Sequence, residues 1–210
     1  MTHKINRVSF FIDGFNVYHA LDDYKSFHKY KWLDYSALAK CFVSSKEIIT
    51  DIFYFTAYAE WDLDKKARHQ LLVRALTIKG VKIVFGKFKR RDKQCHARCR
   101  QFYKTFEEKQ TDVNISVKLF QCAYNNTFDT GILVTGDSDI IPAIVAVKES
   151  FPAKQIGVII PIGRSAEEMK NSCDFHMKMK EKHLKNSQFP DRIIIDSTGN
   201  IFLDRPSTWA

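Results

Sequence analysis

The chain has 210 residues, 45% of them apolar, which is enough for one well-buried domain and excludes a disordered protein. Thirty-three Lys and Arg against 24 Asp and Glu give a formal net charge of +9, which favours a polyanionic partner such as nucleic acid. The first residues lack the apolar core of a signal peptide, and no apolar run is long enough to cross a membrane. We therefore expect a cytoplasmic protein without a membrane partner, whose five cysteines form no disulfide framework.

Strands and helices are expected to alternate along the first part of the chain. Residues 7–13 are almost continuously apolar, which is typical of a strand buried on both faces. A helix follows from about residue 17, and another, with Asp34 as its N-cap, covers residues 34–42. Strands are expected at 52–56 and 81–85, separated by a helix at 65–78. This order predicts a parallel sheet with helical crossovers.

Residues 86–110 interrupt the alternation and form a basic arm. Between residues 82 and 100 there are eight Lys or Arg and one acid, Asp92, so this segment carries a net charge of +7. Phe88, Phe102 and Tyr103 lie among these cations, a mixture that suits single-stranded nucleic acid, whose bases can stack on aromatic rings. The alternative is a solvated loop without a partner. The candidate substrate contacts of the arm are Lys87, Lys89, Arg90, Arg91, Arg98 and Arg100.

A helix is expected at 111–124, with Thr111 as its N-cap and Asp112 in its first turn. We expect this helix to be largely buried, because a broad apolar stripe runs along it. The stripe consists of Val113, Val117, Phe120 and Tyr124, widened by Ile115, Leu119 and Cys122. A strand at 131–135, a helix at 140–149 with Pro142 in its first turn, and a strand at 156–160 follow.

The C-terminal region is expected to be an extension of the domain. Ser165 and Glu168 have the spacing of a capping box, which predicts a short helix to about residue 173. The Lys-rich residues 178–188 are expected on the surface, and residues 193–195 and 201–203 flank a turn and predict a β-hairpin. We therefore expect one domain, residues 1–175, with the arm 86–110 inserted, and an extension over residues 176–210.

Acidic residues follow two of the predicted strands directly. Asp13 ends the first strand, and Asp137 and Asp139 come just after the fourth. We expect an α/β fold with a doubly wound, mainly parallel five-stranded sheet of order 3-2-1-4-5. In such a sheet these strand ends are neighbours at the switch point, and Asp112 can face the same crevice. Four carboxylates together favour Mg²⁺ or Mn²⁺ and thus hydrolysis of a phosphodiester. The alternative is a turn in which Asp139 is only an N-cap and Asp137 a turn residue.

Three motifs in this order resemble the NYN domain, a branch of the PIN-like nucleases: Phe-Ile-Asp-Gly-Phe-Asn at 11–16, Lys-Gln-Thr-Asp-Val at 109–113, and Leu-Val-Thr-Gly-Asp-Ser-Asp at 133–139 with Pro142. The resemblance covers about residues 7–162. It implies a metal-dependent ribonuclease, often a homodimer. Asp13, Asp112, Asp137 and Asp139 would be the metal-binding and catalytic carboxylates and Asn16 a polar residue supporting them. Ser138 and Thr135 would shape the turn and hydrogen-bond a carboxylate or a substrate phosphate.

Three other interpretations are open. Cys95 and Cys99 with His96 supply only three of the four ligands of a structural zinc site, so zinc is the less favoured interpretation. A phosphatase with an aspartyl nucleophile needs a second Asp two residues after Asp13, where this chain has Phe15. A protein of the same fold could also act only as a nucleic-acid-binding module or scaffold, but none of the four acids is missing.

Overall fold

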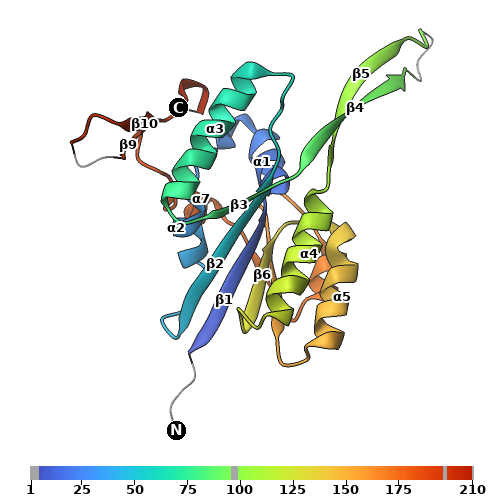
Figure 1. Cartoon of the computed structure of the whole chain (residues 1–210), viewed down its shortest axis with the longest axis vertical. Helices are drawn as coiled ribbons and strands as arrows, with labels where there is room; N and C mark the ends of the chain where they lie inside the picture. Colours follow the sequence, from blue (N-terminus) through green and yellow to red (C-terminus); the bar gives the residue numbers. More distant parts are fainter. Residues whose placement is uncertain (1–4, 96–98, 196–197, 210) are drawn as a thin grey trace.

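A computed structural model of the chain describes residues 5–95, 99–195 and 198–209. Its centre is a six-stranded parallel sheet with the strand order β3-β2-β1-β6-β7-β8 (Figure 1). The strands are β1 (Asn6–Asp13), β2 (Glu47–Thr56), β3 (Lys82–Phe85), β6 (Thr130–Val134), β7 (Gln155–Ile160) and β8 (Phe175–Lys178). The predicted α/β class and the order of the first five strands are confirmed, with the switch point between β1 and β6.

The sixth strand, β8, is a correction to the expected five. It has only four residues, Phe-His-Met-Lys, so neither its length nor its polarity distinguishes it from a surface loop. It pairs with β7 because Gly157 leaves room for the ring of Phe175: a Cβ at residue 157 would lie 2.2 Å from that ring. The sheet thus continues past residue 175, and the expected boundary between the domain and its extension stays a prediction.

Helices cover both faces of the sheet. One face packs against α1 (Gly14–Asp22), α2 (Tyr35–Lys40), α3 (Leu63–Ile78) and α7 (Glu181–Lys185), and the other against α4 (Thr111–Tyr124), α5 (Ile141–Ser150) and α6 (Glu167–Ser172). Short 3-10 helices are η1 (Lys25–Tyr30), η2 (Ser138–Ile140) and η3 (Ser207–Trp209). Strand β1 contributes to both cores: Phe10 and Ile12 to the first, Phe11 to the second. This explains its unbroken apolar sequence.

The predicted helix caps are only partly confirmed. Asp34 caps α2 as expected. The N-cap of α4 is Gln110, in a left-handed conformation with φ 80°, and not Thr111, whose backbone N–H instead donates to Glu108 Oε1 at 3.0 Å. The capping box expected at Ser165 is also wrong, because α6 begins after Ala166 without a side-chain cap.

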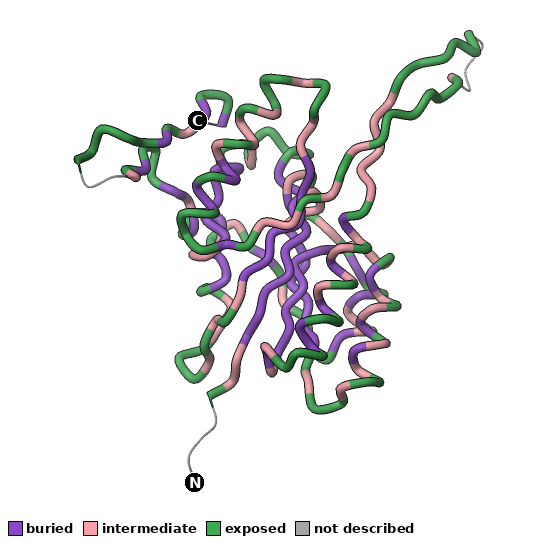
Figure 2. The backbone as a smooth tube through the Cα atoms, viewed as in Figure 1, coloured by how far each residue is buried: buried purple, intermediate pink, exposed green. Residues whose placement is uncertain are grey.

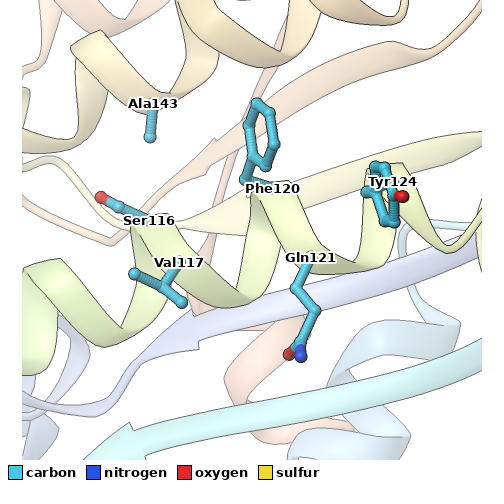
Figure 3. A pocket seen from close by; sticks show the side chains of 6 residues that line it. All are labelled: Ser116, Val117, Phe120, Gln121, Tyr124 and Ala143. Carbon is cyan, nitrogen blue, oxygen red and sulfur yellow. The ribbon is translucent and has the colours of Figure 1, made fainter.

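The expected burial of helix α4 is wrong for half of its apolar residues. Ile115, Leu119 and Cys122 face the sheet and are buried. Val113, Val117, Phe120 and Tyr124 are 38–73% exposed. Figure 2 shows that buried and exposed residues alternate along this helix. Ser116, Val117, Phe120, Gln121 and Tyr124 line a shallow hollow with Ala143 of α5 (Figure 3). A helix packed on one face of a sheet can bury only one stripe, and here both sides of α4 are apolar.

Two antiparallel hairpins project from this body (Figure 1). The basic arm, for which no secondary structure was predicted, is a regular ribbon of β4 (Lys87–Gln94) and β5 (Phe102–Lys109). The C-terminal hairpin is confirmed as β9 (Arg192–Ile194) and β10 (Phe202–Asp204), and Trp209 beyond it packs on Trp32. Within the described ranges, every helix is too short or too polar to span a bilayer.

Candidate metal centre

Three carboxylates meet at the carboxyl edge of the sheet, where β1 and β6 lie side by side. Asp13 is the last residue of β1, Asp137 follows β6 after a short turn, and Asp112 lies in the first turn of α4. Each offers a carboxylate oxygen, and these three oxygens lie within 4.8 Å of one another. The switch point of the sheet therefore brings together residues that are up to 124 positions apart in the chain.

Asp13 is held rigidly and is only 4% exposed. Its Oδ1 accepts a hydrogen bond from the backbone N–H of Asn16 at 3.0 Å, which caps α1, and its Oδ2 accepts one from the Thr135 hydroxyl at 3.0 Å. The chain can enter α1 directly after this strand because residue 14 is glycine. A Cβ there would lie 2.6 Å from the carbonyl oxygen of Phe55.

The turn after β6 is fixed by two side chains, that of Thr135 directly after β6 and that of Asn16 in α1. Thr135 accepts a hydrogen bond from the backbone N–H of Asp137 at 3.0 Å while donating to Asp13. Asn16 Oδ1 accepts one from the N–H of Gly136 at 3.0 Å. These bonds lock the two aspartates to each other, so their separation does not depend on side-chain rotamers alone.

Two of the three carboxyl groups have strongly raised pKa values. Burial, opposed by the hydrogen bonds from Asn16 and Thr135 and reinforced by the charges of Asp112 and Asp137, raises the pKa of Asp13 to about 6. Burial also raises the pKa of Asp112 to about 6, followed by repulsion from Asp137, Glu108 and Asp139. Negative charge is thus concentrated here beyond what the local hydrogen bonds offset.

This donor set fits a divalent cation. Octahedral Mg²⁺ bonded at roughly 2.1 Å has ligand oxygens roughly 3 to 4 Å apart, so only a small adjustment of the three side chains would close a ligand shell. Carboxylate oxygens without His or Cys favour Mg²⁺ and Mn²⁺ over softer metals. A cation would also offset the repulsion that raises the pKa values of Asp13 and Asp112. The triad could therefore bind a divalent metal.

Comparisons with known proteins identify the family of the chain. The sequence matches the NYN domain over residues 7–180, which is most of the chain. The chain belongs to the NYN domain family. This family has the PIN-like nuclease fold.

Two individual proteins are similar to this NYN domain. The 6-hydroxy-3-succinoylpyridine 3-monooxygenase HspA of Pseudomonas putida is 24% identical over 216 aligned positions, which cover 87% of this chain and 68% of that protein. A crystal structure of a protein of unknown function from Vibrio parahaemolyticus superimposes with a TM-score of 0.55 at 15% identity, covering 86% of this chain and 97% of the other. The second likeness concerns the fold alone.

Asp139, the fourth acid expected in the NYN site, does not join the triad. It is exposed in η2, and its backbone N–H donates to Asp137 Oδ1 at 3.0 Å. Asp137 is therefore the N-cap of η2, and the interpretation of Asp139 as a cap is wrong. Asp139 lies close enough for its charge to raise the pKa of Asp112. Ser138 is half-buried and opens η2 between the two aspartates.

Glu108, at the end of the arm, was not expected near the NYN site. Its carboxylate accepts hydrogen bonds from the backbone N–H and the hydroxyl of Thr111, next to Asp112. It thereby joins the arm to the first turn of α4, and its charge contributes to the raised pKa of Asp112. The sequence signal for this contact is the position of Glu108 three residues before the start of the helix, where its carboxylate can accept from a free backbone N–H. The prediction of Thr111 as the N-cap assigned that role to another residue.

The other predicted residues lie on the arm. Lys87, Lys89, Arg90, Arg91 and Arg100 are all exposed, and Arg98 lies outside the described residues. All five cysteines are free thiols; Cys95 is half-buried and Cys99 exposed, while His96 lies outside the described residues. Cys122 belongs to the core, so it is not available as the missing zinc ligand.

Proposed function

We propose that this NYN domain is a metal-dependent endoribonuclease that hydrolyses phosphodiester bonds in single-stranded RNA. The observation that carries the proposal is the convergence of Asp13, Asp112 and Asp137 within 4.8 Å at the switch point. A Mg²⁺ or Mn²⁺ held there would activate water and offset charge that builds up on the phosphate. Family membership supports a nuclease, and the all-oxygen donor set supports a hard cation.

The side chains around the triad have separate tasks in this proposal. Asp13 and Asp137, joined through Thr135, would be the fixed ligands, whereas Asp112, in the first turn of α4, would adjust to the cation. Asp139 is exposed beside them, where it can accept a proton or orient a water. Ser138 has a hydroxyl at the same edge that can donate to a substrate phosphate.

Charge and composition support the class of substrate in this proposal. The net charge of +9 and the basic arm support a nucleic-acid partner, and the aromatic rings among the cations favour a single strand. We further expect that the substrate is RNA, that the protein acts in the cytoplasm, and that it forms a homodimer. HspA is named for a monooxygenase reaction, but three converging carboxylates suit hydrolysis better, because hard oxygen ligands favour cations without redox chemistry.

The proposal is tested by incubating labelled single-stranded RNA with wild type, Asp137→Asn and Glu149→Gln. Glu149 is an exposed acid at the far end of α5, so Glu149→Gln removes the same charge outside the site. We expect cleavage by wild type and Glu149→Gln with Mn²⁺, none with EDTA, and a loss of at least about a hundredfold in Asp137→Asn.

Equal cleavage by all three proteins would identify a contaminating nuclease and contradict the proposal. No cleavage by any of them, together with tight RNA binding, would support the alternative of a binding or scaffold protein. A matched single-stranded DNA substrate, cleaved at the same rate, would contradict the preference for RNA.

A further inference from the structure

The pairing of β4 with β5 sorts the charges of the arm onto two different faces. The register is regular from Lys87 opposite Lys109 to Gln94 opposite Phe102. Residues directly opposite share a face, and successive residues of a strand alternate between faces. One face, the cationic face, carries Lys87, Lys89, Arg91, Lys93, Tyr103, Thr105, Glu107 and Lys109; the other, the inner face, carries Phe88, Arg90, Asp92, Gln94, Phe102, Lys104, Phe106 and Glu108.

Side-chain contacts confirm this sorting independently. Glu107 forms ion pairs with Arg91, Lys93 and Lys109, at 3.5, 3.0 and 3.5 Å, and all four belong to the cationic face. On the inner face, Phe106 stacks on Trp61 with ring centroids 3.8 Å apart. Phe88 of the same face packs edge-on against Trp61 at 4.7 Å. At the base of the arm the inner face is therefore turned towards the body of the protein and the cationic face away from it, while further out both faces are exposed to solvent.

The two faces differ strongly in charge. The cationic face has five Lys or Arg and a single acid, Glu107, whereas the inner face has two cations, Arg90 and Lys104, balanced by Asp92 and Glu108. The arm's excess of positive charge thus lies almost entirely on one side of a two-stranded ribbon. Lys87, Lys89, Arg91 and Lys93 form a row along β4 in which neighbours are about 7 Å apart.

We propose that the cationic face of the arm binds the phosphate backbone of single-stranded RNA and leads it towards the triad. The inference rests on the proposed function for the substrate class. Phosphates are the occupant that a row of exposed cations complements, and only Glu107 competes for them. Tyr103, 52% exposed on the same face, offers a ring on which an unpaired base can stack.

The proposal also separates residues that are adjacent in sequence. Arg90 stands between Lys89 and Arg91 and was expected to contact substrate with them, but its side chain is on the inner face. RNA bound along the cationic face would therefore not contact the side chain of Arg90. The arm joins α4 directly through Glu108 and Thr111, so the cationic face ends one turn away from Asp112.

The test compares two double variants that remove the same charges from opposite faces, Lys89→Ala/Arg91→Ala and Arg90→Ala/Lys104→Ala. Each loses one Lys and one Arg from exposed positions. Binding of a labelled oligouridine RNA is measured in EDTA, without cleavage, over a range of salt concentrations. We expect Lys89→Ala/Arg91→Ala to bind about tenfold more weakly at low salt, with the slope of log K against log salt reduced by about 1.4 for two lost phosphate contacts. The inner-face variant keeps the wild-type slope.

A second pair of variants removes one acid from each face. Glu107→Gln takes away the only acid of the cationic face and should tighten RNA binding several-fold, whereas Asp92→Asn on the inner face should not. If the two double variants weakened RNA binding equally, or the two acid variants changed it equally, the proposal would be overturned. RNA binding would then depend on the net charge of the arm and not on the face. Equal affinity for a duplex of the same length would overturn the single-strand assignment.

The same measurements separate this inference from the proposed nuclease. Because binding is measured in EDTA, it does not depend on the triad, and Asp137→Asn should bind RNA like wild type. A protein that cleaves RNA but shows no difference between the faces would contradict only the binding surface. A protein with the face difference but no cleavage would contradict only the nuclease.

Discussion

Thr135 connects the two aspartates that come from neighbouring strands. Its hydroxyl donates to Asp13 and accepts from the backbone N–H of Asp137, both at 3.0 Å, and it is fully buried. A buried hydroxyl with two such bonds sets the distance between two candidate metal ligands without having to touch a metal itself.

Thr135→Val is expected to weaken both stability and Mn²⁺ binding, because the methyl group satisfies neither partner. Leaving buried groups unpaired costs about 1–3 kcal/mol, so the melting temperature and the Mn²⁺ affinity should both fall. Thr135→Ser keeps the hydroxyl and is the matched control in calorimetric titration and thermal melting. If Thr135→Val bound Mn²⁺ as tightly as Thr135→Ser, Thr135 would have no positioning role.

At the scale of elements, Trp61 attaches the arm to the body. It lies in the loop before α3, stacks on Phe106 and contacts Phe88, which in turn meets Phe15 of α1 at 5.4 Å. Aromatic contacts of this kind contribute about 0.5–1.5 kcal/mol each beyond the area they bury. The orientation of the arm therefore depends on a residue outside it.

Trp61→Ala is expected to loosen the arm without removing a charge. Amide exchange in β4 and β5 should become up to about tenfold faster, and RNA affinity should fall, while the salt slope stays at the wild-type value. Trp61→Phe keeps a ring in the same place and should behave almost like wild type. A reduced salt slope in Trp61→Ala would contradict this role, since no phosphate contact is lost.

The sixth strand depends on one glycine. A Cβ at residue 157 would clash with the ring of Phe175, so Gly157→Ala should overpack the contact between β7 and β8 and cost about 2 kcal/mol in the free energy of unfolding. Adding Phe175→Leu should restore part of this loss, and denaturant melts of both single variants and the double variant measure it. Purely additive losses would show that Phe175 is not what Gly157 accommodates.

At the scale of the whole molecule, the triad couples folding to the binding of protons and, in the proposed function, to the binding of a metal ion. Without metal, the pKa values of Asp13 and Asp112 are raised from 3.8 to about 6, so the folded state binds protons more tightly than the unfolded state. Their contribution to stability is complete below pH about 4 and is lost as the pH rises through 6. A bound cation requires both groups to be ionised, so its affinity must rise over the same range.

We therefore expect opposite pH trends with and without metal. In EDTA, Asp112→Asn should gain stability relative to wild type as the pH rises from 4 to 7, because it lacks one of the repelling charges. The increase in wild-type melting temperature caused by Mn²⁺ should be larger at pH 7.5 than at pH 5. Thermal melts over this range measure both, and a Mn²⁺ effect independent of pH would contradict a carboxylate site.

The sequence alone determined the strand order and the three acids of the triad, because these depend on local signals. Apolar β-branched runs ending in Asp13 and before Asp137 define buried parallel strands, and the rule for switch points then places their ends together. Asp112 was recognisable from its motif and helix start. Each of these positions depends on a few neighbouring residues.

Tertiary structure alone decided what depends on pairing and packing over long distances. The regular register of β4 with β5 separates Arg90 from Lys89 and Arg91, although the three are consecutive in sequence. Packing on the sheet exposes Val117 and buries Leu119 of the same helix. Asp139, two residues from Asp137, stays outside the triad because Asp137 caps η2. A side chain's face is set by its partner strand or sheet, which local sequence does not encode.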